Sequence, residues 1–388
     1  MDLGLTDEQR MIVDTVRGFV REQIIPIERD LDPDADELPP ADRARLVQMV
    51  KDMGLYCPDV PEELGGPGID AVTFALMSME MSQHAAGLYV PCYGVFGGSG
   101  LAQLFEATDD QKERYLFPTL RGEKKGFFAL TEPAGGSDPA GAIETTAERD
   151  GDDWILNGTK HFISGADRAQ FGITFARTDK SKGRDGVTCF IVDTDAPGFH
   201  IRRVIHTLRS AKYAMEIQFE NMRVPAKNVL GEVNKGFAIA RDRTARQRIP
   251  YAAVCVGVAR LAQDMAIEYA KARSTFGKPL ASRQAIQWMI VDNEMDIEHA
   301  RLVTLNAAWK VDKGEPFVAA ASMAKVVATE AASRVVDRSM QIHGGMGVAK
   351  ELPLERWYRE LRIRRIGEGP NEIQRMIIAR DLLGTSLR

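Results

Sequence analysis

The sequence predicts an α+β protein in which a strand-rich middle segment lies between two helical segments. Apolar residues recur at three- and four-residue spacing up to about residue 122 and again from about residue 233, which is typical of amphipathic helices. Between these segments, short apolar runs alternate with Asp, Gly and Pro, as in strands joined by turns. We therefore predict three domains: helical over 1–122, β over 123–232 and helical over 233–388.

The first segment carries a helix start signal and several helical patterns. Thr6 followed by Gln9 fits a capping box, in which each side chain bonds the other residue's backbone N–H. Further helical patterns cover residues 42–54, 72–84 and 109–120.

The middle segment changes to strand-like runs. Asn157-Gly158 lies between the runs 154–156 and 160–163 and predicts a hairpin turn. Other predicted strands cover residues 171–176, 186–192, 199–203 and 215–219. Because no long helices separate these runs, we expect an antiparallel barrel or sandwich rather than a βαβ fold.

The last segment contains three long helical patterns, over residues 248–272, 283–313 and 316–342. Glycine-rich stretches at 344–347 and 367–370 interrupt the pattern. Helices of this length predict a four-helix bundle.

Composition describes an ordinary soluble protein. The 388 residues are 44% hydrophobic and 27% charged, with a net charge of −5 that gives no attraction to nucleic acid or anionic membranes. The sequence has no signal-peptide pattern and no apolar run near the ~18 residues of a membrane span. Four cysteines lie far apart without a CxxC pair, so we expect reduced thiols in a cytoplasmic protein, with no metal site.

One carboxylate stands out near the C-terminus. Glu368 lies between Gly367 and Gly369, directly after a cationic run and before a helical pattern. Glycines allow a ligand to approach closely, and desolvation would raise the pKa of this carboxylate toward that of a general base. The alternative is a solvated loop that leads into the last helix, and the segment by itself leaves both open.

Four other motifs have both a binding and a structural interpretation. Residues 130–138 offer hydroxyls and glycine N–H groups to a flavin edge or phosphate, or form an ordinary turn. Phe162 and Ser164 share one face of a strand and could line a planar cofactor, or belong to the core. Arg273 is either a phosphate ligand or a favourable cation at a helix C-terminus. Residues 341–347 are either a ligand loop or a glycine helix cap.

A basic run precedes Glu368. It comprises Arg356, Arg359, Arg362, Arg364 and Arg365. The run is short, has few stacking aromatics and belongs to an acidic chain, so nucleic-acid binding is not expected. We interpret it as a solvated helix face or a subunit interface.

Taken together and in this order, the motifs at 131–138, 157–164, 273–277, 341–347 and 368–375 resemble the acyl-CoA dehydrogenase family over nearly the full length. The resemblance implies the same α–β–α arrangement, a homotetramer built as a dimer of dimers, and one FAD per subunit. It also implies an electron-transferring flavoprotein as acceptor.

The resemblance implies roles for individual residues. Glu368 would be the catalytic base, and the substrate would lie near Ser137, Gln247, Arg248 and Gly369. Residues implied to contact the FAD of the same subunit are Phe128, Leu130, Thr131, Gly136, Ser137, Phe162, Ile163, Ser164, Pro370 and Asn371. Residues implied to reach the FAD of a neighbouring subunit, or to lie beside those that do, are Arg273, Thr275, Phe276, Gln284, Gln341, Gly344 and Gly345.

The implied reaction is α,β-dehydrogenation of an acyl-CoA to the trans-2-enoyl-CoA. Some members place the base near Gln247, but glutamine cannot serve as a base. Alternatives are an acyl-CoA oxidase, which is typically longer, and a non-catalytic flavoprotein scaffold.

The chain departs from the family pattern at several positions. Gly367 replaces a tyrosine, Pro370 a threonine and Phe162 a tryptophan. Glycines at 94, 97, 98 and 100 suggest a roomy acyl pocket or simply a broken helix.

Overall fold

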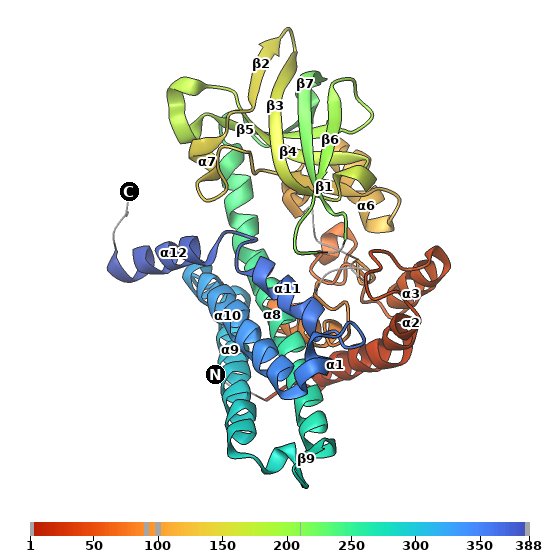
Figure 1. The fold of residues 1–388 in the computed structure, drawn as a ribbon. Coiled ribbons are helices and arrows are strands. Elements are labelled where there is room, and N and C mark those ends of the chain that lie inside the picture. The colour runs from red at the N-terminus through yellow and green to blue at the C-terminus, as the bar shows by residue number, and fades with distance from the viewer. Residues whose placement is uncertain (1–3, 89–91, 93, 98–101, 210, 385–388) are drawn as a thin grey trace.

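The computed structural model describes residues 4–88, 92, 94–97, 102–209 and 211–384, with only the backbone of residues 240–243. The sheet lies at one end of the molecule, and long helices extend from it to the opposite end (Figure 1). In the described residues, no helix is both long enough and apolar enough to span a bilayer.

The N-terminal part is helical, as predicted. Its elements are α1 (Asp7–Phe19), the π-helical turn η1 (Val20–Ile24), α2 (Ile25–Arg29), α3 (Pro40–Asp52), η2 (Glu62–Leu64), α4 (Ala71–Met81), η3 (Ala102–Glu106), α5 (Asp109–Gln111), the π-helical turn η4 (Lys112–Leu116) and α6 (Phe117–Arg121). The capping box is confirmed: Gln9 N donates to Thr6 Oγ1 at 3.1 Å, and Thr6 N donates to Gln9 Oε1 at 3.2 Å. Both π turns lie just before a proline, Pro26 and Pro118, which cannot donate to the helical ladder.

The central part forms one sheet. Its elements are β1 (Gly126–Ala129), α7 (Pro139–Ala142), β2 (Thr146–Asp150), β3 (Asp153–Ser164), η5 (Ala166–Arg168), β4 (Phe171–Arg177), η6 (Lys180–Asp185), β5 (Val187–Asp193), β6 (Phe199–Ile205), β7 (Ala214–Val224), η7 (Ala226–Asn228) and β8 (Val229–Leu230). The strand order is β6-β7-β3-β2-β4-β5-β8, and β1 pairs with β4. Most pairs are antiparallel as predicted, but β1 runs parallel to β4, and β2 meets β4 in a single parallel pair.

The predicted hairpin turn at Asn157-Gly158 is wrong. Both residues lie inside the continuous strand β3, where the pairing with β7 shifts register between Leu156 and Gly158. A Cβ on Gly158 would lie 2.4 Å from Thr145 Oγ1, so glycine here allows a close backbone approach at a bulge. The turn comes earlier, where Asp150 pairs with Asp153 around Gly151 at φ +63°.

Two central strands explain how this sheet meets the N-terminal helices. All but the last residue of β4 and of β5 are buried, which is typical of strands covered on both faces. Phe190 and Val192 belong to the core inside the sheet domain, whereas Ile173 and Ile191 pack with Tyr115 and Leu116 of η4.

The C-terminal part contains the three long helices. Its elements are α8 (Gly236–Ala272), β9 (Ser274–Thr275), β10 (Lys278–Pro279), η8 (Leu280–Ser282), α9 (Gln284–Asp312), α10 (Val318–His343), η9 (Gly344–Val348), α11 (Leu354–Arg364) and α12 (Asn371–Leu383). Helix α8 begins twelve residues before the predicted start at 248 and continues through Pro250. The hydrophobic core of the C-terminal part is shared by α8, α9 and α10 and also includes Leu76 of α4 and Trp357 of α11.

Candidate active site

Glu368 lies in the short loop between α11 and α12. Its backbone has φ +55°, and Gly369 follows at φ +82°, so two consecutive residues are left-handed. A left-handed glutamate costs about 1 kcal/mol or more and persists only where its surroundings hold it.

A lysine and a glutamine hold this loop. Lys325 Nζ, from α10, donates to Gly369 O at 3.0 Å, to Arg365 O at 3.3 Å and to Asn371 Oδ1 at 2.8 Å. Gln374 Nε2, one turn into α12, donates to Glu368 O at 3.3 Å and to Gly369 O at 3.1 Å. Sequence reasoning did not find Lys325, although a lysine within the apolar stripe of a helix was an available signal.

The Glu368 carboxylate has no hydrogen-bond donor among the described residues, yet it is strongly influenced by charge. Glu368 is an exposed residue, but protein atoms crowd its carboxylate, and this desolvation raises its pKa. Arg248, Arg364 and Lys325 oppose the rise. Desolvation also lowers the pKa of Arg248, and it lowers that of Lys325 to about 8.

The predicted substrate residues on α8 lie near this loop. Arg248 is buried, donates from Nη1 to Ser322 Oγ at 3.2 Å and acts electrostatically on Glu368. Its Nε has no hydrogen-bond partner in the described structure. Gln247 is half-buried one residue earlier. Ser137 belongs instead to the central part, on the exposed segment before α7.

Most residues predicted to contact the FAD of the same subunit belong to the central, sheet-containing part. His161 N donates to Thr131 O at 2.9 Å and so joins the segments that carry Thr131 and Phe162. Phe162 is 54% exposed at φ +59°, and Ser164 is exposed two residues later. On the other segment, Gly136 and Ser137 are exposed, and Phe128, Leu130 and Thr131 are half-buried. An accessible aromatic ring with nearby hydroxyls and glycines fits a planar, hydrogen-bonding group.

Two members of that set are used differently from the prediction. The Ile163 side chain is buried in the sheet core, so only its backbone could meet a ligand. Asn371 is buried, and its amide nitrogen donates to Thr329 Oγ1 at 3.2 Å and to Glu330 Oε1 at 3.0 Å. Its side chain therefore fastens α12 to α10. Pro370 is half-buried just before it.

The second set lies at the other end of the long helices, beside the β9–β10 ribbon (Figure 1). Phe276 is 97% exposed at φ +51° in the turn of that ribbon. Ile342 packs with Leu280 there, and the His343 ring lies 4.5 Å from the Tyr269 ring, which brings the end of α10 to the same place. The remaining members are exposed, apart from the half-buried Thr275: Arg273, Gln284, Gln341, Gly344 and Gly345.

Glu132, within the motif at 131–138, forms a buried ion pair with Lys160 that sequence reasoning missed. Lys160 Nζ lies 2.6 Å from Glu132 Oε1 and also donates to Phe175 O at 2.6 Å. Glu132 Oε2 accepts from Glu144 N at 2.6 Å and from Thr145 N at 3.1 Å. This pair fixes the motif to β3 and β4.

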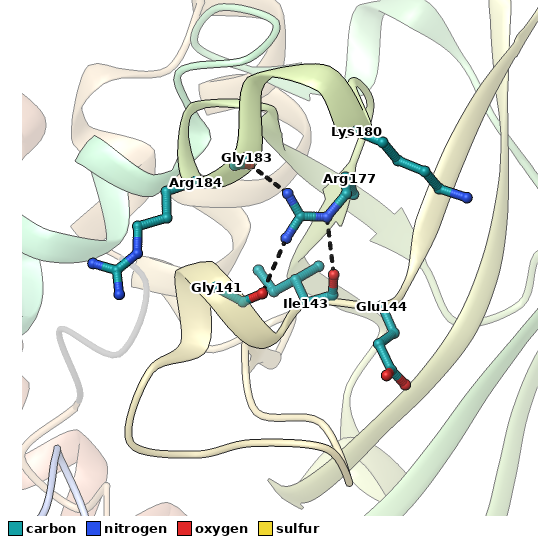
Figure 2. Close-up of a pocket in the computed structure, with 7 residues that line it drawn as sticks. All are labelled: Gly141, Ile143, Glu144, Arg177, Lys180, Gly183 and Arg184. Carbon is teal, nitrogen blue, oxygen red and sulfur yellow. Dashed lines mark hydrogen bonds between the residues drawn. The ribbon is translucent and has the colours of Figure 1, made fainter.

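A pocket of about 520 Å³ lies between the α7–β2 connection and η6, in the central part rather than at the Glu368 loop (Figure 2). Arg177 lines it but donates to Ile143 O at 3.1 Å and Gly141 O at 3.4 Å on one side and to Gly183 O on the other, so its guanidinium holds the two segments together. Lys180 and Arg184 point away from these contacts, and Arg184 pairs with Asp138 at 2.6 Å.

One cluster has ligand-type side chains. Glu28, His84 and Cys92 place their ligand atoms within 4.8 Å of one another. The Glu28 carboxylate already accepts from Ala85 N and Ala86 N, each at 2.9 Å, and lies 2.8 Å from His84 Nδ1. These bonds give the cluster a structural role. All four cysteines, which lie in the described part, are buried and none forms a disulfide.

Models of known protein families match nearly the whole chain. The N-terminal, middle and C-terminal domains of acyl-CoA dehydrogenases match residues 6–123, 127–222 and 234–383. The chain belongs to the acyl-CoA dehydrogenase family. Members are FAD-dependent oxidoreductases, and the exposed Phe162 and its neighbours fit that cofactor.

Relatives match over nearly the whole chain. The 3-(aryl)acrylate reductase of Clostridium sporogenes is 40% identical and covers 97% of this chain and 99% of its own. The short-chain specific acyl-CoA dehydrogenase of Bos taurus is 39% identical, over 98% and 91%. The structure of butyryl-CoA dehydrogenase from Megasphaera elsdenii is similar with a TM-score of 0.88 and 34% identity, over 99% of this chain and 100% of that one.

Proposed function

We propose that this chain oxidises an acyl-CoA thioester to the trans-2-enoyl-CoA, with Glu368 as the base that removes the α-proton. The observation that carries the proposal is the Glu368 loop itself. It presents a crowded carboxylate of raised pKa on a strained backbone that Lys325 and Gln374 hold in place. A base with a raised pKa is better matched to a weakly acidic carbon acid.

The loop also offers a donor for the substrate. In the described structure, no acceptor takes the backbone N–H of Glu368. In the proposed complex, this N–H donates to the thioester carbonyl and stabilises the enolate charge that develops when the α-proton leaves. Bound FAD supplies the acceptor for the hydride that leaves the β-carbon.

The separation of the two cofactor sets supports a composite site. Phe162 and Ser164 lie at the sheet end, whereas Phe276 lies in the ribbon at the opposite end of the long helices. We infer that Arg273, Phe276, Gln284, Gln341 and Gly345 serve the FAD of a neighbouring subunit in a homotetramer. Dilution that dissociates the oligomer should then release FAD.

The deciding experiment is anaerobic titration of the purified yellow protein with a panel of acyl-CoA thioesters. We expect bleaching of the flavin and formation of the enoyl-CoA. No bleaching by any member of a broad panel would favour the non-catalytic scaffold. After bleaching, rapid return of colour in air would indicate an oxidase, and return only with an electron-transferring flavoprotein would indicate a dehydrogenase.

A second candidate is the reverse reaction, favoured by the reductase name of the Clostridium sporogenes relative. Chemically reduced enzyme would then be reoxidised by a 3-arylacrylyl-CoA faster than the oxidised enzyme is bleached by the saturated thioester.

The glycines at 94, 97, 98 and 100 bear on the size of the acyl pocket. Of the four glycines suggesting a roomy pocket, those at 98 and 100 lie outside the described residues. Gly94 and Gly97 have φ of +81° and +74°, and a Cβ on Gly97 would lie 2.5 Å from Cys57 Sγ. These two glycines therefore support the alternative of a broken helix.

A further inference from the structure

Arg364 is turned into the protein, although the sequence suggested that its basic run is a solvated helix face or a subunit interface. It is only 6% exposed, at the end of α11 and four residues before Glu368. Its Nη2 donates to Leu88 O, and its guanidinium lies 4.1 Å from the centroid of the Tyr251 ring. Its Nε has no partner in the described structure.

Other arginines around α11 have carboxylate partners. Arg359 pairs with Glu355 at 2.9 Å, and Arg209 pairs with the buried Glu360 at 2.7 Å. In the described part of the chain, no carboxylate lies within ion-pair distance of Arg364. Glu368 acts on it only from a greater distance.

The charges around Glu368 do not balance. Arg248, Arg364 and Lys325 all act on this one carboxylate. A buried cation without a counter-ion carries an uncompensated desolvation cost. An apolar acyl chain beside it would leave this cost in place, whereas an anionic group would remove it.

Tyr251 adds a second donor beside this guanidinium. A Cβ on Gly367 would lie 2.8 Å from Tyr251 Oη, so the phenol fills the space that a side chain at position 367 would take. Desolvation raises the pKa of Tyr251, so the phenol keeps its proton at neutral pH. The loop is thus flanked by a phenol O–H and an arginine with a free N–H.

We propose that Arg364 and Tyr251 form a recognition site for a carboxylate carried by the acyl group, so that the preferred substrates are CoA monothioesters of dicarboxylic acids. This inference rests on the proposed function of Glu368 as base. A guanidinium suits a planar carboxylate, to which it can donate more than one hydrogen bond. A substrate carboxylate paired with Arg364 would also offset one of the positive charges that lower the pKa of Glu368.

The test compares thioesters of equal length with and without a terminal carboxylate. Succinyl-, adipyl- and suberyl-CoA are measured against butyryl-, hexanoyl- and octanoyl-CoA in anaerobic flavin reduction. We expect at least one carboxylate thioester to exceed its neutral counterpart in kcat/KM. Arg364→Met should lower that value about 10- to 100-fold more than it lowers kcat/KM for the neutral thioester, and Tyr251→Phe about tenfold more, because both classes share any effect on Glu368.

Two controls separate recognition from folding. Arg362→Met removes a charge from the exposed face of the same helix and should leave both classes of substrate unchanged. Binding of adipyl- and hexanoyl-CoA to the Glu368→Gln protein, measured by calorimetry, tests recognition without turnover and without altering Arg364.

The outcomes distinguish this inference from the proposed function. Efficient reduction by neutral thioesters with no advantage for any carboxylate thioester, in rate or binding, overturns the recognition site and leaves Glu368 as the base. Equal losses on both classes in Arg364→Met, with equal binding of both classes to Glu368→Gln, also overturn it. Reduction by no thioester of either class overturns both.

Discussion

Two carboxylates crowded by protein, Glu132 in the sheet domain and Glu368 between α11 and α12, have opposite surroundings. Glu132 has one cation, Lys160, at 2.6 Å, and backbone N–H groups of residues 144 and 145 complete its shell. Glu368 has three cations acting from a distance and no donor to its carboxylate among the described residues.

The difference separates architecture from chemistry. A buried ion pair whose atoms are all hydrogen-bonded holds chain segments together and has no capacity left for a ligand. A crowded carboxylate with unused oxygens keeps that capacity, and its raised pKa is what proton transfer requires. Four predictions test this contrast.

The largest effect is expected at Glu368. Glu368→Gln removes the base while keeping the shape of the side chain, and should slow flavin reduction about a thousandfold or more with FAD retained. Stopped-flow absorbance measures the rate. The matched control Glu372→Gln, on the exposed first turn of α12, should keep normal rates. Substantial reduction by Glu368→Gln would mean that another group is the base.

The second prediction concerns the balanced pair. Lys160→Met leaves the Glu132 carboxylate buried without its cation and should cost about 3–5 kcal/mol of unfolding free energy in chemical denaturation. Adding Glu132→Gln should restore part of the loss. Lys182→Met, which breaks an exposed pair with Asp179, should cost far less stability. Equal losses of stability in Lys160→Met and Lys182→Met would show that the buried pair stabilises the fold no more than an exposed pair does.

The third prediction concerns Lys325, which positions the Glu368 loop. Lys325→Met removes the donors to Gly369 O and Asn371 Oδ1 and should lower kcat by about 10- to 100-fold. KM should change much less, because Lys325 need not touch substrate. The exposed Lys313→Met serves as control. A rise in KM with an unchanged kcat would place Lys325 in substrate binding instead.

The smallest effect is the pH dependence of flavin reduction. Glu368 must be ionised to accept a proton, and because its pKa is raised, the rate should increase with pH through a midpoint above 4.5. It should fall above about pH 8, where Lys325 loses a proton and one donor. If the Lys325→Met protein loses flavin-reduction rate over the same alkaline range, another group causes that loss.

Lys325 should also make the stability of the protein depend on pH. Its pKa falls from 10.5 in the unfolded chain to about 8 in the folded one, so the unfolded chain binds more protons between these values. Stability from this group therefore rises with pH across that window, opposite to the activity.

Sequence reasoning predicted most of the fold because local patterns and packing agreed. The helical period, the capping box of Thr6 and the apolar runs at 171–176 and 186–192 correspond to elements in the structure. It misplaced one hairpin turn, at Asn157-Gly158, whereas the turn lies at residues 150–153. An Asn-Gly pair favours a turn, but a glycine is also needed where another backbone comes close, as Thr145 does here.

The sequence by itself determined the family, the α–β–α order and Glu368 as the candidate base, because these depend on residue type, spacing and order. Only the tertiary structure showed that Lys325 holds the loop, that Asn371 fastens α12, and that Arg364 faces inward beside Tyr251. The loop and its neighbours on α8 and α10 are brought together from distant parts of the chain. Hydrogen bonding, desolvation and charge balance depend on that proximity, and a local pattern does not contain it.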